Sequence, residues 1–315
     1  MSWTLALEAG LAALVLGVAV WTLSVRQTFA AVVAFVVYGL ALTLVWVRLS
    51  ALDVALTEAA IGSGLTGVLL LGAAARLRAT EADAVAERPG AGVRAAAAAL
   101  AALVALALAA ALLYLPEPAH TLAPAAMAEL PATGMRNAVT GVLMAYRAAD
   151  TLLEKVVVLI SLIGVWSLAQ DKLWGGRPGP LHHADPDGAL AFLARRLPPV
   201  GIVAGIYIAW LGADQPGGAF PGGTIIAAMW LLAMMAGVTD APPISRRWLR
   251  LVLVAGPAVF LAVGFSGFFT AGAFLAYPVA YAKALIVVIE VGMVLTIAAT
   301  LGLLMAGPPE RSDKP

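Results

Sequence analysis

The sequence predicts an all-α, polytopic integral membrane protein with about nine transmembrane helices, its N-terminus outside and its C-terminus inside. Of the 315 residues, 62% are hydrophobic and only 12% are charged, and the mean hydropathy is +0.96. A soluble domain is usually about half apolar and about a quarter charged. Long apolar stretches recur from end to end, and no segment alternates between apolar and polar residues as a strand does.

An α-helix needs about 20 mostly apolar residues to cross a hydrocarbon core of about 30 Å. Such stretches lie at residues 3–25, 28–47, 51–75, 95–115, 148–169, 197–213, 222–238, 249–269 and 279–306. The first has no basic residue before it and exceeds the core of a signal peptide, which is about 7–15 residues, so we interpret it as a retained span.

The basic residues predict the orientation of these spans. If the N-terminus is outside, the links on the cytoplasmic side contain most of the Lys and Arg residues, namely Arg26, Arg76, Arg78, Arg88, Arg94, Lys172, Arg177, Arg195, Arg196, Arg246, Arg247, Arg250, Arg311 and Lys314. The opposite side has only Arg48, Arg136 and Arg147. Links rich in Lys and Arg stay in the cytoplasm, so we expect an N-out, C-in topology.

Several classes of cofactor are not expected. The chain has no cysteine, which excludes disulfides, iron–sulfur clusters and thiolate metal sites. His120, His182 and His183 all fall between spans, which argues against a haem held inside the membrane. The run from His182 to Asp187 is interpreted as a solvated link. Since the sequence also contains no P-loop and no basic tract, we expect no cofactor, no metal and no nucleic-acid partner.

Polar links divide the chain into three parts. Residues 1–94 contain three spans, residues 95–185 contain two, and residues 186–315 contain four. The segment 116–147 begins with prolines and ends in a moderately amphipathic stretch, which we expect to lie at the outer surface.

Charged side chains inside the spans are the main functional signal: Glu58, Glu154, Lys155, Lys283 and Glu290. A charge at this depth is costly unless it faces protein or water, and such residues typically mark ion or proton paths. Glu290 lies two turns, about 10 Å, beyond Lys283 on the same helix face. Snorkelling to the surface explains Lys283 but hardly Glu290. The alternative for Glu290 is a buried structural hydrogen bond.

Asp53 and Glu58 open the third span. Five helical residues turn the chain by about 500°, so the two carboxylates point about 140° apart and do not form a pair. Glu58 continues onto Gly62 and Thr66, a stripe that lets a neighbouring helix or water approach. The alternative is a capping Asp53 and a structural hydrogen bond from Glu58.

Residues 62–67 match the pattern G-x-G-x-x-G of dinucleotide-binding proteins. No strand precedes the pattern, so nucleotide binding fails the test of context. We expect close helix packing or a local distortion of the helix instead.

Charges also crowd the start of the fifth span. Asp150 and Glu154 are four residues apart and share a helix face. Lys155 follows Glu154 directly, and an acid beside a base at membrane depth gives a proton a place to move. The alternative is an interfacial salt-bridge cluster that anchors the helix.

The link 214–223 joins two short spans and is rich in glycine and proline. These residues lower helix propensity and allow close backbone approach, so we expect a tight turn. A broken segment between short spans is also typical of ion sites in transporters, which stays open as an alternative.

Three motifs together resemble one family. The sequence Pro216-Gly217-Gly218-Ala219-Phe220-Pro221-Gly222-Gly223 is similar to the P-G-G-G-F-x-G-G turn of the B subunit of Mrp-type multisubunit cation/proton antiporters (the MnhB-like module), as is Glu290-Val291-Gly292 in the last span. The stretch 53–62 resembles the small domain at the end of the antiporter A subunit (MbhD-like), and 137–169 resembles the domain that follows it (MbhE-like), through the stretch 147–154. Membrane-bound hydrogenases of the complex I superfamily carry the same modules as separate subunits.

The resemblance implies a fusion of these three modules that acts as an accessory subunit of an antiporter complex in the prokaryotic cell (inner) membrane. The acids that match Glu58 and Glu154 are implicated in ion or proton passage in the family. The expected partners are other membrane subunits, including large complex I-like pumping subunits, and the chain alone is not expected to be an enzyme. Two positions depart from the family: Gly212-Ala213-Asp214 stands in place of G-H-N, and Ala219 replaces a glycine.

Two rival functions remain. The first is a subunit in the membrane arm of a complex I-like redox enzyme, such as a membrane-bound hydrogenase. The local residues do not separate it from an antiporter subunit, because the redox chemistry would lie on other polypeptides. Alternatively, it is a scaffold without an ion path, in which the acids only hold helices together.

Overall fold

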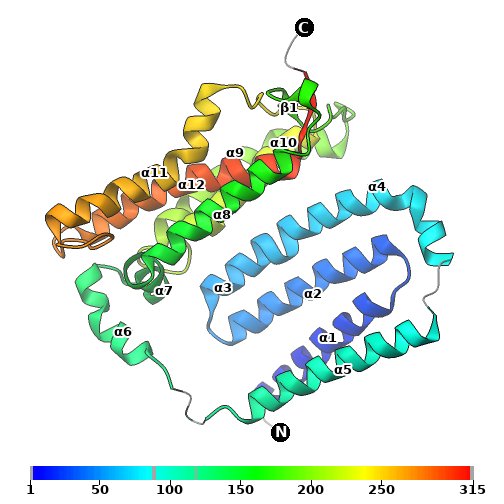
Figure 1. The fold of residues 1–315 in the computed structure, drawn as a ribbon, viewed down its shortest axis with the longest axis horizontal. Coiled ribbons are helices and arrows are strands. Elements are labelled where there is room, and N and C mark those ends of the chain that lie inside the picture. The colour runs from blue at the N-terminus through cyan, green and yellow to red at the C-terminus, as the bar shows by residue number, and fades with distance from the viewer. Residues whose placement is uncertain (1–2, 87–89, 117, 119, 313–315) are drawn as a thin grey trace.

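The computed structural model describes residues 3–86, 90–116, 118 and 120–312, and these are almost entirely helical (Figure 1). The predicted cytoplasmic residues Arg88 and Lys314 lie outside the described residues. The all-α membrane class predicted from composition is therefore confirmed for the part of the chain that is described.

Seven of the described helices are long and apolar enough to cross a membrane, by length and composition. They span Trp3–Ser24 (α1), Thr28–Arg48 (α2), Leu52–Leu77, Ala91–Leu113 (α5), Ala189–Leu211 (α9), Arg247–Thr270 (α11) and Ala282–Ala306 (α12). The other two predicted spans are also helices: α8, Ala148–Trp166, has three charged residues near its start, and α10, Ala219–Met235, has only 17 residues. The predicted number of nine crossings thus stays a prediction.

The third predicted span is one continuous helical rod with a distorted middle. It consists of α3 (Leu52–Thr57), the π-helix η1 (Glu58–Leu65) and α4 (Thr66–Ala86). The distortion lies where the glycine-rich segment 62–67 predicted close packing or a distorted helix. A side chain at Gly39 of α2 would collide with Ser63, because its Cβ would lie 2.4 Å from Ser63 Oγ. Glycine at this position therefore permits the close approach of α2 and η1.

Helices α9 and α10 both begin earlier than the sequence predicted. Helix α9 starts at Ala189 and runs through Pro198 and Pro199, although each proline lacks the N–H that a helical hydrogen bond needs. Its extra first turns bury Ala191 and Ala194, and this packing accounts for the longer helix. Helix α10 starts at Ala219, so Phe220, Gly222 and Gly223 lie in its first turns and not in the predicted turn.

Short elements fill the rest of the described chain. They are α6 (Ala123–Glu129), the 3₁₀ turn η2 (Leu130–Thr133), α7 (Ala138–Gly141), the π turn η3 (Val142–Tyr146), the 3₁₀ turn η4 (Asp171–Leu173) and the strands β1 (Arg177–Pro178) and β2 (Pro309–Arg311). The predicted amphipathic stretch before residue 147 is thus a series of short turns. The backbone N–H groups of Arg136 and Asn137 both donate to the carbonyl of Ala213, which fixes this series against the link between α9 and α10.

The helices form two groups, visible in Figure 1. In the first, α2 packs against α1, η1 and α4; in the second, α12 packs against α8, α10 and α11. Helix α12 is the centre of the second group, where Ile286, Ile289 and Leu303 are fully buried. Contacts of α10 with η1 and α3 join the two groups. Helix α5 contributes no buried residue.

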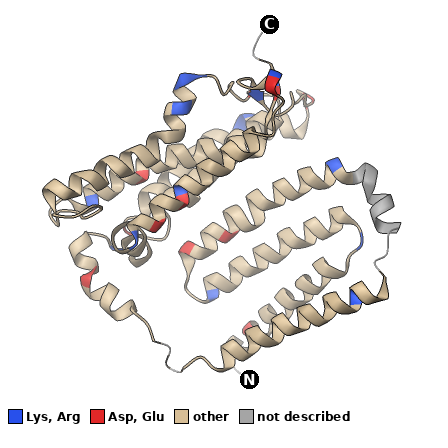
Figure 2. Cartoon of the chain, viewed as in Figure 1, with Lys and Arg blue, Asp and Glu red and all other residues tan. Residues whose placement is uncertain are grey.

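The distribution of charge along the helices agrees with the predicted orientation (Figure 2). Basic residues gather at the end of the molecule where β1 and β2 lie and where α11 begins. At the opposite end, α2 finishes with Arg48, which forms an ion pair with Glu8 of α1 at 3.1 Å. We refer to these two ends as the cytoplasmic and the outer end, following the predicted topology.

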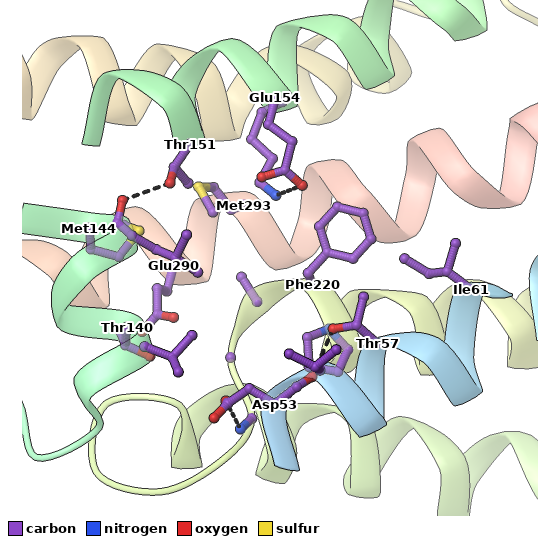
Figure 3. Close-up of a pocket in the computed structure, with 18 residues that line it drawn as sticks. Asp53, Thr57, Ile61, Thr140, Met144, Thr151, Glu154, Phe220, Glu290 and Met293 are labelled. Carbon is purple, nitrogen blue, oxygen red and sulfur yellow. Dashed lines mark hydrogen bonds and ion pairs between the residues drawn. The ribbon is translucent and has the colours of Figure 1, made fainter. Parts of the chain in front are cut away.

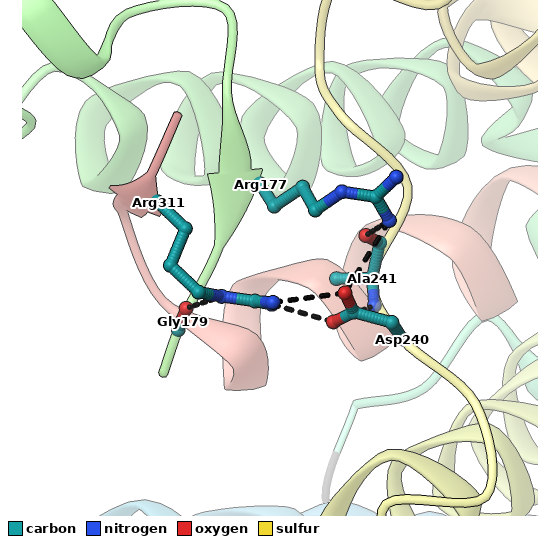
Figure 4. A network of polar contacts seen from close by, with 5 residues as sticks. All are labelled: Arg177, Gly179, Asp240, Ala241 and Arg311. Carbon is teal, nitrogen blue, oxygen red and sulfur yellow. Dashed lines mark hydrogen bonds and ion pairs between the residues drawn. The ribbon is translucent and has the colours of Figure 1, made fainter. Parts of the chain in front are cut away.

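Two short strands lie in this otherwise helical chain, and the sequence did not predict them. Strand β1 pairs with β2 antiparallel, with Arg177 opposite Arg311. Elements of two and three residues are too short for an alternating pattern, and their partners lie far apart along the chain, so no local signal marks them. Asp240 connects this sheet to the loop before α11, since both of its oxygens accept hydrogen bonds from Arg311, with Nη1 at 2.8 Å from Oδ2 (Figure 4).

The charge of Asp240 contributes a small, pH-dependent stabilisation to this contact. The hydrogen bonds from Arg311 hold the pKa of this carboxyl below its usual value of 3.8. Since its side chain is 34% exposed, we expect Asp240→Asn to lower the free energy of unfolding by only about 1 kcal/mol at neutral pH. The folded-state pKa lies below the unfolded one, so the stabilisation is complete above pH 3.8 and is lost as the pH falls further.

Thermal unfolding of the detergent-solubilised protein at pH 7 and in acid checks this expectation. The exposed Asp187 provides the control, since Asp187→Asn should change neither curve. A difference between wild type and Asp240→Asn that persists unchanged in acid would contradict the assignment to the ionised carboxylate.

Candidate functional site

A cavity of about 380 Å³ lies toward the outer end, where both helix groups meet (Figure 3). Its walls come from α3, η1, α7, η3, α8, the link before α10, the start of α10, and α12. The residues that line it are Asp53, Val54, Thr57, Ile61, Val139, Thr140, Leu143, Met144, Thr151, Glu154, Lys155, Gly217, Gly218, Ala219, Phe220, Pro221, Glu290 and Met293. All three predicted modules therefore contribute to a single cavity.

Glu290 is the acidic side chain most deeply buried in this cavity. It lies on α12 between the core residues Ile289 and Met293, and the residue is 7% exposed. The backbone N–H of Ala219, at the start of α10, donates a hydrogen bond to its carboxylate. Thus the predicted acid of the last span faces protein and the cavity rather than lipid.

The link between α9 and α10 reaches Glu290 because of its glycines. Gly217 and Gly218 have φ angles of 157° and 111°, and residues with a side chain rarely adopt either conformation. A Cβ at Gly218 would lie 3.4 Å from Oε1 of Glu290. The absence of side chains lets the backbone lie directly beside the carboxylate and aims the N–H of Ala219 at it.

Asp53 holds this link from the other helix group. Its Oδ1 accepts a hydrogen bond from the N–H of Gly217 at 3.0 Å and another from Nδ2 of Asn137 at 3.2 Å. The same Nδ2 also donates to the carbonyl of Gln215 at 3.1 Å. One carboxylate oxygen in the first module therefore binds the second and the third modules together. The described hydrogen bonds of the Asp53 side chain are with the other modules. They therefore do not support the alternative interpretation of Asp53 as a helix cap.

Lys155 brings a positive charge into the cavity. Its side chain is 4% exposed, whereas its ion-pair partner Glu154, 3.2 Å away, is 50% exposed. The ammonium group also lies 4.1 Å from the centre of the Phe220 ring, within the range of a cation–π contact. Glu154 and Lys155 thus form the predicted acid–base pair, with the exposed acid toward the surface and the buried base inside.

Three threonine hydroxyls on the cavity wall have their protons engaged elsewhere. Thr57, Thr140 and Thr151 donate to the carbonyls of Asp53, Gly212 and Leu143, respectively. Each hydroxyl oxygen keeps acceptor capacity toward the cavity. The wall can therefore accept hydrogen bonds from water even where its carbon atoms are apolar.

Three of the predicted residues lie outside this cavity. The carboxylate of Glu58 lies over Gly62 and next to Gly39, within the packing of η1 against α2. Asp150 forms an exposed ion pair with Arg147 at 2.6 Å. Lys283 donates to both oxygens of Asp214, at 2.7 and 2.8 Å. Its charge is therefore balanced by an ion pair with the link between α9 and α10, and not by snorkelling to the membrane surface.

Two residues that position the site were missed by the sequence analysis. Asn137 caps α7, and its Oδ1 accepts from the N–H of Val139 at 2.9 Å. Asparagine before a short helix signals such a cap, but nothing in the sequence identifies Asp53 as its second partner. Asp214 was noted only as a departure from the family pattern. Among the described residues, no group of three or more His, Cys, Asp or Glu side chains could hold a metal ion.

Comparison with protein-family models matches two parts of the chain. Residues 13–79 match MbhD, the D subunit of MBH, and residues 189–307 match a domain related to the MnhB subunit of Na+/H+ antiporter. These ranges lie within the first and third predicted modules. The boundaries of the modules stay predictions, and so does the middle module.

A curated relative and two solved structures are also similar to the chain. An uncharacterised protein of Methanocaldococcus jannaschii is 27% identical over 154 residues, which cover 44% of this chain and 59% of that protein. A chain in the structure of the Mrp complex from Dietzia sp. DQ12-45-1b has a TM-score of 0.75 and 25% identity, over 97% of this chain but 35% of that one.

The second structure is the membrane-bound sulfane sulfur reductase, an archaeal respiratory membrane complex. One of its chains has a TM-score of 0.54 and 23% identity, over 68% of this chain and 98% of that one, a likeness that concerns the fold.

Proposed function

We propose that this chain, in which residues 13–79 match MbhD and residues 189–307 match an MnhB-related domain, is an accessory membrane subunit of a monovalent cation/proton antiporter complex. Within that complex it contributes intramembrane carboxylates to an ion or proton path. The observation that carries the proposal is the gathering of Glu154, Lys155 and Glu290 around one cavity.

The path that this cavity supports begins at the half-exposed Glu154. Lys155, positively charged in its ion pair with Glu154, first releases a proton through water in the cavity to the carboxylate of the buried Glu290. The neutral amine that remains then takes up a proton that has bound to Glu154, 3.2 Å away. Each step breaks one N–H or O–H bond and forms another, and the hydroxyl oxygens of the wall accept hydrogen bonds from the intervening water. Glu58, outside the cavity and at the start of the π-helix η1, is a further proton-binding group on the side of the first module.

Large uncovered surfaces support a role as one subunit among several. Only 6% of the α1 span and none of the α5 span is buried within the chain. These helices are available to lipid and to other membrane subunits, among them the large pumping subunits that the family implies. We propose the prokaryotic cell membrane as the site of this assembly.

Inside-out vesicles that contain the complete complex test this function. A dye that reports the pH gradient is followed after addition of Na+ or K+, with the chain present and with its gene deleted. We expect cation-dependent proton movement only when the chain is present, and normal movement in its absence would refute the proposal.

The second candidate is a subunit in the membrane arm of a redox complex, and the fold likeness to a chain of the respiratory sulfane sulfur reductase complex favours it. The two candidates predict different companions. Mild-detergent purification followed by mass spectrometry would identify either antiporter subunits alone or subunits with iron–sulfur or nickel sites. In the second case, proton movement should require an electron donor rather than a cation gradient.

A further inference from the structure

Asp53 differs from the other titratable residues of the cavity in how its carboxylate is used. Its Oδ1 accepts two N–H groups, from Gly217 and from Asn137, whereas Glu154 has one described ion-pair partner, Lys155. A carboxylate oxygen that accepts two such hydrogen bonds is held in a fixed orientation, and both donors would lose a partner if it moved. These are the properties of a structural acceptor and not of a group that must bind and release a proton in each cycle.

The backbone leads from Asp53 to Glu290 within three residues. Gly217 donates to Asp53, Gly218 follows beside Oε1 of Glu290, and Ala219 donates its N–H to the Glu290 carboxylate. The glycines that permit this path have little intrinsic preference for it. An external hydrogen bond is therefore needed to select this conformation of the link, and Asp53 supplies it from the other helix group.

We infer that Asp53 is a positioning residue that acts on Glu290 through the link 214–219, and that it does not itself carry the transported proton. This inference rests on the proposed function and specifies the division of work within the cavity. Glu154, Lys155 and Glu290 carry the proton, while Asp53 and Asn137 hold the donor of Ala219 in place.

Two substitutions at the same position separate the two roles. Asp53→Asn keeps an oxygen that can accept from Gly217 and Asn137 but cannot ionise, whereas Asp53→Ala removes the acceptor. We expect Asp53→Asn to retain nearly wild-type proton flux in vesicles that contain the complete complex. Asp53→Ala should reduce the flux by about tenfold, because a small displacement of a reacting group is costly.

The pH profile provides a readout that a purely structural defect would not move. Besides Asp53, the titratable groups that line the cavity with Glu290 are Glu154 and Lys155 of α8. Helix α10 has no charged residue, and α11 has only Arg247 and Arg250 in its first turns. In Asp53→Ala the carboxylate of Glu290 loses the N–H of Ala219, so the acidic limb of the flux profile should move to higher pH, while the profile of Asp53→Asn should stay in place.

A measurement without transport keeps this inference separate from the proposed function. The infrared carbonyl band of protonated Glu290 is identified in the purified complex as the band that disappears in Glu290→Gln. This band should shift in Asp53→Ala but not in Asp53→Asn. If Glu290→Gln leaves the flux normal, the proposed function fails. If Glu290→Gln abolishes flux but both Asp53 variants behave alike, in flux and in band position, only the present inference is overturned.

Two further variants complete the test. Asp150→Ala removes an exposed acid that does not line the cavity, and it should alter neither the profile nor the band. If Asp53→Ala does not assemble, Asn137→Ala takes its place, because it removes one donor to Asp53 and the contact with Gln215. It should shift the profile and the band in the same direction, and an unchanged profile would overturn the inference.

Discussion

Replacing Glu290 by glutamine is expected to reduce proton flux by at least about a hundredfold, the lower end of the usual effect of a positioned proton-transfer group. The amide has nearly the same size and shape as the carboxyl group but cannot take up and release a proton. Glu290 is 7% exposed and lies in the cavity wall. The threonine hydroxyls of the same wall donate their protons to backbone carbonyls. No other described carboxylate is as deeply buried in the cavity, so no neighbour can replace it.

The complex should still assemble in this variant. The neighbouring core residues Ile289, Met293 and Ile297 keep their packing, and the amide oxygen can accept the N–H of Ala219. Flux is measured with a pH-sensitive dye in inside-out vesicles, and the amount of assembled complex is measured by native gel electrophoresis. Normal flux at a normal level of complex would mean that Glu290 only holds helices together, as the scaffold hypothesis states.

Two variants serve as controls for this result. Glu290→Asp retains a carboxyl group but withdraws it by one methylene, so we expect an intermediate flux. Asp150→Asn changes an acid of the same end of the molecule that is exposed and paired with Arg147, and it should leave the flux unchanged. A loss of flux in Asp150→Asn would indicate a general effect of charge at the outer end.

The parts of this fold that the sequence predicted are those set by local composition. Apolar stretches of about 20 residues identified the long helices because a bilayer imposes that length. Glycines at 62–67 predicted the distorted packing of η1 for a similarly local reason. The same reasoning identified Glu290 as a buried acid, since an ionisable side chain near the middle of an apolar helix has few other places to lie.

The parts that the sequence did not predict depend on partners that are distant along the chain. Asp53 is 84 residues from Asn137 and 164 residues from Gly217, and no periodic pattern connects residues at such separations. The ion pair of Lys283 with Asp214 joins residues 69 apart. For the same reason the sequence did not indicate that Asp53 binds the link or that Lys283 pairs with Asp214.

Replacing Gly217 by alanine is expected to lower the free energy of unfolding by about 3 kcal/mol, because strain and steric overlap act together. A Cβ at this position would lie 2.3 Å from the carbonyl oxygen of Ile208. That oxygen accepts the N–H of Gly218 at 3.0 Å, so it cannot move away without breaking the link. The displaced link would also withdraw from Asp53 and from Glu290, and flux should fall along with stability.

Two other glycines separate the causes of this effect. Gly272 has a φ of 81°, but a Cβ added there would meet no atom within 4 Å, so Gly272→Ala tests backbone strain alone. We expect it to cost about 1 kcal/mol. Gly72 lies in α4 with open space around it, and Gly72→Ala should be neutral or slightly stabilising, since alanine favours a helix by up to about 1 kcal/mol.

The three variants are compared by the temperature at which the purified complex dissociates, followed by fluorescence-detected size-exclusion chromatography. The expected order of destabilisation is Gly217→Ala, then Gly272→Ala, with Gly72→Ala close to wild type. If Gly217→Ala loses no more stability than Gly272→Ala, the contact with Ile208 does not constrain the link. The close backbone approach would then not explain why this turn, which places the N–H of Ala219 at Glu290, is built from glycine.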